Sequence, residues 1–166
     1  MLWNGGLPEP GSGGQPVTNI SWYAAEAYAR WFSGKYARLS GLTARLPKED
    51  EWEAAARLNG VIDNINELPP GLKAASAADA GEIGLRGMAG NVREWCLDTY
   101  RINDNLFRTS DGRKQPVNIQ GLPVTPEKVV RGGAFVDGNL DYPVVARGGL
   151  PGSFTSPAVG FRLVLE

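Results

Sequence analysis

The sequence contains no histidine and only one cysteine, Cys96. Histidine is the side chain that most often transfers protons near neutral pH, and it is a common metal ligand. Its absence excludes Ser-His-Asp and Cys-His catalysis, histidine-ligated zinc, and iron sites that use two histidines. A single cysteine cannot form an intramolecular disulfide or a cysteine metal cluster, so the core alone must stabilise the fold.

Long apolar runs and an excess of positive charge are also missing. No run approaches the roughly 18 apolar residues of a membrane span, and the first residues lack the basic and apolar regions of a signal peptide. The 17 basic residues are balanced by 18 acidic ones, so the chain as a whole does not attract phosphate backbones or anionic lipid. We therefore expect no nucleic-acid partner, no membrane insertion and no signal peptide in this chain.

Glycine and proline are abundant, with 22 and 12 residues in a chain of 166. This composition indicates many turns and irregular segments, and the length suits one domain with its own core. Residues 1–16 are rich in glycine, proline and serine, which predicts a flexible N-terminal arm. Residues 17–166 are then expected to form a single domain.

Two helices are predicted from apolar spacing and end signals. The first follows Ser21, a natural N-cap, and is expected to stop at Gly34. The second follows Pro47, has acidic residues in its first turn and ends before Gly60. Strand-like stretches at Val129–Phe135 and Phe161–Leu165 flank a long irregular segment, so the expected class is α+β. The tryptophans expected in the core are Trp22, Trp31, Trp52 and Trp95.

Four blocks of sequence resemble the formylglycine-generating-enzyme (sulfatase-modifying factor) family. They are, in order, NISWYAAEAYARW, ARLPKEDEWEAAAR, GLRGMAGNVREW, and VVRGGAF with a terminal GFRLV. Each block alone is a weak signal, but four in this order make a specific match over about residues 16 to 166. The resemblance implies a C-type-lectin-like fold with two helices, a small antiparallel sheet and much irregular loop.

The resemblance also bears on catalysis. Oxidase members of the family carry a copper-binding cysteine pair in the final segment, and the matching positions here are Asn139 and Val144. The iron-dependent relatives need histidines, which this chain lacks. We therefore predict that the chain is not an enzyme and has no catalytic residues, and that Cys96 is a buried apolar side chain.

A calcium ion is the one cofactor that the resemblance implies. Its ligands would be the backbone carbonyls of Gly90 and Val92 and the carboxylate of Glu94. Calcium prefers six to eight oxygens, and Gly87 stands where the family usually supplies a side-chain ligand. The alternative is that Glu94 pairs with a neighbouring arginine. No other cofactor is predicted.

The final segment resembles one branch of the family, the variable proteins of diversity-generating retroelements. These proteins place a mutagenised stretch between an RGG motif and a terminal GFR, and the mutated codons cannot encode Lys, Gln, Glu, Met or Trp. Residues 136–159 contain none of these five residue types. A glycine- and proline-rich loop that simply avoids long side chains would also explain the absence.

The leading hypothesis is a non-catalytic ligand-binding domain, for receptor recognition or adhesion, with residues 136–159 as a diversified binding surface. Its target is unknown and is expected to be a protein on another cell or particle, and the resemblance implies display on a cell surface or virion. The alternative is a degenerate, non-catalytic structural or regulatory relative of the oxidase. Tyr142 and Phe154 are expected as anchors of the surface. The predicted contact residues are Val136, Asp137, Asn139, Asp141, Tyr142, Val144, Leu150, Ser153, Phe154 and Thr155.

Overall fold

The structure of the protein is a computed structural model that describes most of the chain. The described residues are 3–4, 7–8, 13–61, 64–65, 71–78, 80–88, 90–100, 126–137 and 142–166. Side chains are described in these ranges except at residues 3–4, 7–8, 37–40, 64–65 and 142. Two predicted contact residues, Asn139 and Asp141, and the side chain of a third, Tyr142, therefore lie outside the described part.

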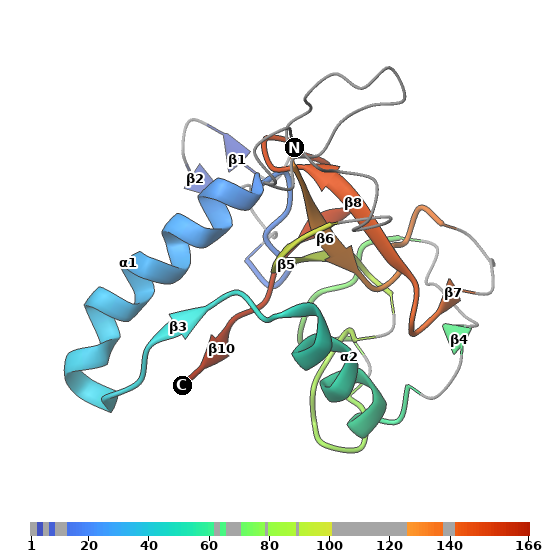
Figure 1. Ribbon diagram of the computed structural model, residues 1–166, viewed down its shortest axis with the longest axis horizontal. Helices are drawn as coiled ribbons and strands as arrows, with labels where there is room; N and C mark the ends of the chain where they lie inside the picture. Colours follow the sequence, from blue (N-terminus) through green and yellow to red (C-terminus); the bar gives the residue numbers. More distant parts are fainter. Residues whose placement is uncertain are drawn as a thin grey trace, which may run out of the picture.

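A four-stranded sheet lies at the centre of the domain (Figure 1). Its strand order is β8 (Arg147–Pro151), β6 (Glu127–Arg131), β5 (Arg93–Thr99), β9 (Val159–Gly160). Strand β6 is antiparallel to both of its neighbours, whereas β9 runs parallel to β5. The segment predicted to be variable therefore leaves the sheet after β6, contributes β8, and returns at β9 on the far side of β5.

Three pairs of short strands surround this sheet, and all three are antiparallel. The pair of β3 (Ala44–Arg45) and β10 (Val164–Leu165) holds the C-terminal residues beside the connection between the two helices (Figure 1). A second pair joins β4 (Asn64–Ile65) to β7 (Tyr142–Pro143). The third, β1 (Trp3–Asn4) with β2 (Leu7–Pro8), lies inside the arm predicted for residues 1–16, whose flexibility stays a prediction.

Helix α1 (Trp22–Ser40) is longer than predicted, and helix α2 (Glu49–Leu58) ends where predicted. The Oγ of Ser21 accepts a hydrogen bond from the amide of Ala24, as expected of an N-cap. The prediction that α1 stops at Gly34 is wrong. A single glycine costs a helix only about 1 kcal/mol relative to alanine, and the rings of Phe32 and Tyr36 pack one turn apart, 4.5 Å between centroids, across that position.

The predicted strands are also shorter in the structure. Strand β6 ends at Arg131 because Gly132 adopts a left-handed conformation, with φ of +76°. At this position an added Cβ would lie 3.1 Å from the ring of Trp52. Of the predicted stretch Phe161–Leu165, only the two residues of β10 form a strand.

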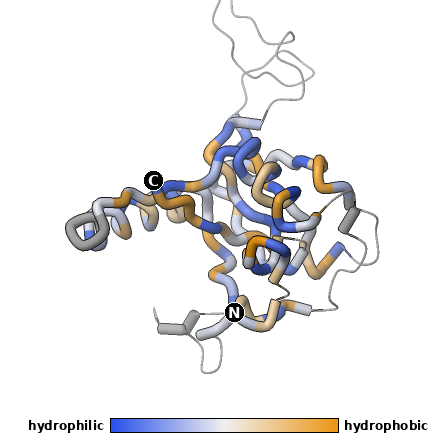
Figure 2. The backbone as a smooth tube through the Cα atoms, turned by 90° about the horizontal axis from the view of Figure 1, so that it is seen from below, coloured by the Kyte–Doolittle hydropathy of each residue, from blue (hydrophilic) through white to orange (hydrophobic). Residues whose placement is uncertain are grey.

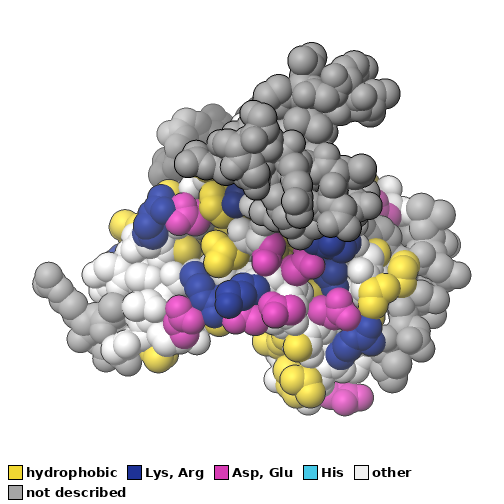
Figure 3. Space-filling view, viewed as in Figure 1, with side chains coloured by type: hydrophobic (Ala, Val, Ile, Leu, Met, Phe, Trp, Pro, Cys, Tyr) yellow, Lys and Arg dark blue, Asp and Glu magenta, His cyan; other side chains and the backbone are white. Residues whose placement is uncertain are grey.

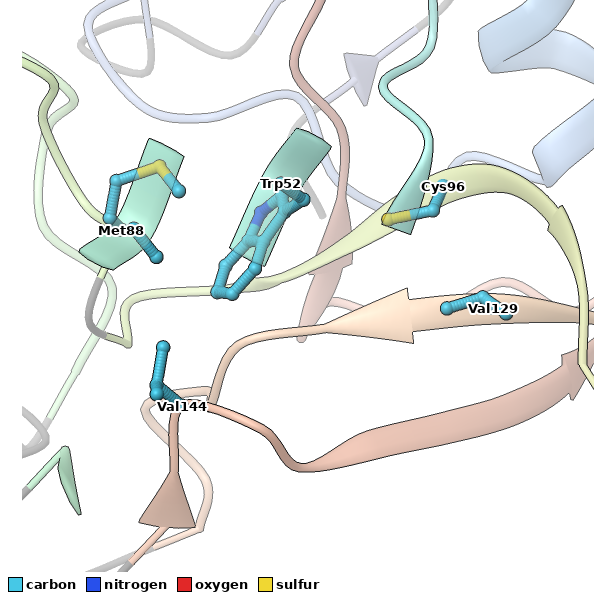
Figure 4. Close-up of a cluster of buried hydrophobic side chains, with 6 residues drawn as sticks. Trp52, Met88, Cys96, Val129 and Val144 are labelled. Carbon is cyan, nitrogen blue, oxygen red and sulfur yellow. The ribbon is translucent and has the colours of Figure 1, made fainter. Parts of the chain in front are cut away.

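The core consists of two clusters on opposite faces of the sheet. Side chains alternate along a strand, so the neighbours Trp95 and Cys96 point to opposite faces, as do Val129 and Val130. The cluster under α2, shown in Figure 4, contains Trp52, Ala56, Met88, Cys96, Val129 and Val144. The cluster under the first half of α1 contains Ala25, Leu46, Trp95, Val130 and Val159.

The second half of α1 extends away from the body of the domain (Figure 2). Strand β3 runs alongside it, and the Oγ of Ser33 accepts from the amide of Ala44 at 2.6 Å. Trp31 lies on the opposite side and is 53% exposed. The prediction that Trp31 belongs to the core is therefore wrong, whereas Trp52 and Trp95 are fully buried as predicted.

Ion pairs link α2 and β3 to their surroundings. On the face shown in Figure 3, basic and acidic side chains lie next to one another. Both terminal nitrogens of Arg45 donate to the carboxylate of Glu51, at 2.7 and 2.8 Å, and its Nε donates to Glu166 at 3.0 Å. Arg147 pairs with Glu49 at 2.8 Å. Neither sign of charge dominates this face of the molecule.

The pair of Arg45 and Glu51 predicts a measurable pH dependence of stability. Hydrogen bonds from Arg45 lower the pKa of Glu51 from 4.5 to about 2. A lowered carboxylate pKa stabilises the fold above the unfolded-state value, and this stabilisation is lost as the pH falls through the folded-state value. The melting temperature of Glu51→Gln should therefore lie below that of the unchanged chain at pH 7, and the difference should shrink toward pH 2.

Because Glu51 is more than a third exposed, its contribution should not exceed about 1 kcal/mol. The matched control is the same pair of measurements in an Arg45→Met background, where Glu51→Gln should have a smaller effect, because only part of the pKa shift, that from the Lys48 amide, then remains. A difference that persists unchanged at pH 2 would show that Glu51 acts through packing rather than charge.

Candidate ligand-binding surface

The predicted variable segment begins at a turn that is fixed by hydrogen bonds. The amide of Asp137 donates to the carbonyl of Ala134 at 2.9 Å, and the amide of Ala134 donates back to the Asp137 carboxylate at 2.7 Å. The amide of Phe135 donates to the carbonyl of Asn91 at 3.0 Å. The same Asp137 carboxylate pairs with Arg93 of β5. The turn is thereby tied to the central sheet.

Three of the predicted contact residues turn out to support the fold. Asp137 is engaged by Arg93 and by its own turn, as just described. Val144 is buried in the cluster under α2, and Leu150 packs against the cluster under α1. The structure therefore does not place these side chains on an open face. The physical reason is that this segment also supplies a sheet strand and a piece of the core.

Four other predicted contact residues do point to solvent. Val136 is 56% exposed and Phe154 is 40% exposed, while Ser153 and Thr155 are also exposed. Of Tyr142 only the backbone is described, and it pairs with Ile65 in the strand pair β4–β7. The described part of the segment thus presents an apolar residue in the first turn and a short aromatic and polar run in a second one.

This second turn, residues 151–157, is held against the start of α1. The amide of Trp22 donates to the carbonyl of Gly152 at 3.0 Å, and the amide of Asn19 donates to the carbonyl of Ser156 at 2.9 Å. Within the turn, the amide of Phe154 donates to the carbonyl of Pro151 at 2.8 Å. The backbone that carries the exposed side chains is therefore well fixed.

Tyr23 joins this turn, although the sequence did not single it out. A Cβ added to Gly152 would lie 3.0 to 3.1 Å from the phenol ring of Tyr23, so the ring rests directly on the turn backbone. Tyr23 is 53% exposed. The sequence signal that could have identified Tyr23 is a large aromatic residue near the N-cap Ser21, on the side of the helix that does not face the core. We define the exposed side chains Tyr23, Val136, Ser153, Phe154 and Thr155 as the candidate binding residues.

Glu94, the predicted calcium ligand, is engaged by protein groups instead. It is 6% exposed and accepts a hydrogen bond from the indole nitrogen of Trp52 at 2.7 Å. Arg162 donates to both of its oxygens, through Nε and through a terminal nitrogen at 2.6 Å. Burial lowers the pKa of Arg162, but the charge and hydrogen bonds of Glu94 outweigh burial and hold that pKa above its ordinary value.

The residues present do not fit a calcium ion at this position. The one predicted side-chain ligand already bonds a guanidinium, and the carbonyls of Gly90 and Val92 alone fall short of the six to eight oxygens that calcium prefers. Among the described residues, no group of three or more His, Cys, Asp or Glu side chains could hold a metal ion. The second alternative drawn from the sequence, an arginine partner for Glu94, agrees with the geometry.

Cys96 is buried in the cluster under α2 and is a free thiol, as predicted. Burial raises the pKa of this thiol far above its ordinary value, and the charge of Glu94 raises it further. The reactive thiolate form is therefore strongly disfavoured.

Comparison with known families decides the classification. The sulfatase-modifying factor enzyme 1-like domain matches residues 4–166. The chain belongs to this family. The resemblance found in the four sequence blocks is thereby confirmed, and the match runs through both helices and all four strands of the central sheet.

Curated relatives of this sulfatase-modifying factor domain differ in their names. Serine/threonine-protein kinase pkn1 of Chlamydia pneumoniae is 32% identical over 139 residues, which cover 76% of this chain and 20% of that protein. Formylglycine-generating enzyme of Thermomonospora curvata is 31% identical, with 73% and 45% covered. Inactive C-alpha-formylglycine-generating enzyme 2 of Bos taurus is 33% identical, with 62% and 41% covered. The chain thus spans between a fifth and a half of these relatives.

These relatives correct one prediction. The absence of histidine and of a cysteine pair led us to predict that the chain is not an enzyme, and that prediction is contradicted because relatives at about 31% identity are named as enzymes. Missing residue types exclude particular mechanisms, but they do not remove a chain from an enzyme family.

Solved structures confirm the fold of this sulfatase-modifying factor domain. PvdO from Pseudomonas aeruginosa superposes with a TM-score of 0.70 at 20% identity, covering 96% of this chain and 64% of that one. Treponema denticola variable protein 1 superposes with a TM-score of 0.65 at 23% identity, covering 95% and 74%. The α+β, C-type-lectin-like prediction is therefore confirmed. Within the described residues, neither helix is long and apolar enough to cross a membrane.

Proposed function

We propose that this chain is a ligand-recognition domain whose binding surface consists of the candidate binding residues of the C-terminal segment together with Tyr23. The observation that carries the proposal is the contrast between backbone and side chains in the 151–157 turn. The backbone is held to α1 by hydrogen bonds, while Ser153, Phe154 and Thr155 are exposed. The shared fold with a Treponema denticola variable protein supports the proposal as a likeness of scaffold.

The physical advantage of this arrangement is preorganisation. A surface that is already ordered loses less conformational entropy when a partner binds. Tyrosine and phenylalanine supply a large contact area with only two side-chain torsions each, and serine and threonine add adaptable hydrogen bonds around them. A few central aromatic contacts within a polar surround are typical of protein-binding sites. The proposed target is a protein on another cell or particle, met by a domain displayed on a cell surface or virion.

The proposal also separates positions that can vary from positions that cannot. Val136 and the exposed residues of the 151–157 turn can be replaced without disturbing either core cluster. Val144, Leu150 and Val159 belong to or pack against those clusters, and Asp137 fixes the first turn. Diversification of this segment should therefore be tolerated at some positions and rejected at their neighbours.

Two libraries test this proposal. A face library randomises Val136, Ser153, Phe154 and Thr155, and a matched core library randomises Asp137, Val144, Leu150 and Val159 in the same segment. On the surface of yeast, most face-library clones should resist protease, whereas most core-library clones should be cleaved. Selection against hen egg lysozyme as a model target should yield binders from the face library only. Equal loss of folding in both libraries would contradict the proposal.

The selected binders then test the part played by α1. Within them, Tyr23→Ala should weaken binding by at least about tenfold, equivalent to about 1.4 kcal/mol, because Tyr23 rests on the turn that carries the varied side chains. Tyr36→Ala, at the far end of the same helix, should leave the affinity unchanged. Equal effects of the two substitutions would remove Tyr23 from the proposed surface.

A further inference from the structure

One buried cluster lies where strand β5, helix α2 and the C-terminal residues meet. The Glu94 carboxylate of β5 receives three hydrogen bonds, one from Trp52 of α2 and two from Arg162. A terminal nitrogen of Arg162 also donates to the carbonyl of Arg86 at 3.1 Å. One guanidinium therefore donates to a buried carboxylate and to a backbone carbonyl, the same kinds of oxygen that a divalent cation would coordinate.

We propose that the guanidinium of Arg162 is the permanent counter-ion of Glu94. It occupies the position beside this carboxylate that the family resemblance assigns to calcium. The proposal goes beyond ligand recognition and does not depend on it. Two features of the geometry favour it. Glu94 is 6% exposed and Arg162 is largely shielded, so the pair attracts strongly and a second cation beside it would be strongly repelled.

The second feature concerns the groups around the pair. Gly87, which follows the carbonyl that Arg162 bonds, has no side chain to offer a metal and adopts a left-handed conformation with φ of +66°. The carboxylate oxygens of Glu94 keep little accepting capacity after three hydrogen bonds. The ion pair also links the C-terminal residues to the centre of the sheet.

Calcium dependence of stability tests the proposal. The melting temperature of the unchanged chain should be the same in EDTA and in millimolar calcium. Arg162→Met keeps an apolar stem but removes the charge, which leaves Glu94 without a cation. This variant should melt several degrees lower in EDTA and should regain part of the loss in calcium, because a ligand that binds only the folded state stabilises it.

Terbium binding gives a second readout at the same place. Terbium takes calcium sites and luminesces when a nearby tryptophan is excited, and Trp52 bonds Glu94 directly. Arg162→Met should show sensitised terbium emission, and the double variant Arg162→Met/Glu94→Gln should lose it. The matched control is Arg30→Met, which removes the arginine of an exposed helical pair with Glu26 and should not alter the response to either ion.

Several results would overturn the proposal. A calcium-dependent rise in the melting temperature of the unchanged chain would show that the guanidinium does not replace a metal. An Arg162→Met variant that folds but takes up neither ion would show that the charge of Arg162 is not what keeps cations out. If Arg162→Met does not fold, Arg162→Lys decides: it keeps a positive charge and should remain indifferent to calcium, and a calcium response there would contradict the proposal.

Discussion

Trp95→Ala is expected to lower the free energy of unfolding by about 3–5 kcal/mol, the usual cost of removing a buried tryptophan. Trp95 is 0% exposed and packs among Ala25, Leu46 and Val130 between α1 and the sheet. Its indole nitrogen also donates to the carbonyl of Ile20 at 3.0 Å. The substitution therefore leaves both a cavity and an unpaired carbonyl. Urea denaturation followed by circular dichroism measures the loss.

The matched control is Trp31→Ala, the same change on an exposed surface. Trp31 contacts the ring of Tyr28 at 5.4 Å between centroids and lies under the ammonium group of Lys35, both on its own helix. Its removal should cost no more than about 0.5 kcal/mol, as for most surface substitutions. Equal losses for the two tryptophans would mean that the aromatic side of α1 is covered in solution, which a dependence of stability on protein concentration would reveal.

These two tryptophans show how far the sequence predicts the fold. The helical spacing of Ala25 and Ala29 identified α1 and the side of it that faces the sheet. Trp31 was nevertheless also expected in the core, because it offers a large apolar surface for burial. The side that packs is lined by Ala25 and Ala29, which allow a close approach, and the larger Tyr28 and Trp31 remain exposed. The expectation that the largest apolar side chains of a helix face the core fails here. Helix α1 lies close to the sheet, and only small side chains fit between the two.

The candidate binding residues were predictable only in part. Composition marked the whole stretch 136–159, and the ends of that stretch were set by the RGG and GFR motifs. The sequence did not show that Leu150 lies in a strand opposite Lys128, and so could not separate core from surface within the stretch. Tyr23 was missed because its place depends on contact with a turn far along the chain. The sequence predicted an arginine partner for Glu94 but did not identify it as Arg162, because the two residues lie 68 positions apart.

Arg131→Met is the second substitution with a large expected effect. Arg131 is 2% exposed and donates to the Glu53 carboxylate at 2.6 Å, to the carbonyl of Val144 at 3.0 Å and to that of Val145 at 3.2 Å. Breaking a buried ion pair by removing one partner typically costs about 3–5 kcal/mol. Urea denaturation should show a loss of this size, because two carbonyls and one oxygen of the Glu53 carboxylate lose the same donor together.

Arg57→Met provides a control on the same carboxylate. Arg57 also donates to Glu53, at 3.0 Å, but its side chain is 45% exposed and the pair is of the ordinary helical type, four residues apart. Its removal should cost less than about 1 kcal/mol. If both variants lose the same free energy of unfolding, Arg131 acts through its ion pair with Glu53 and not through its hydrogen bonds to the two carbonyls.

Hydrogen exchange can locate the effect of Arg131→Met in the structure. Val144 and Val145 begin the return of the segment to the sheet, and the amide of Ala146 donates to the carbonyl of Pro143 at 2.8 Å. Without Arg131, the amides of Ala146 and of the adjoining β8 should exchange much faster than those of β5. A uniform acceleration would show that Arg131 stabilises the whole core alike. A local acceleration would mean that Arg131, which is not among the varied positions, holds the segment where it returns to the sheet. Arg131 would thereby position the exposed side chains of the segment.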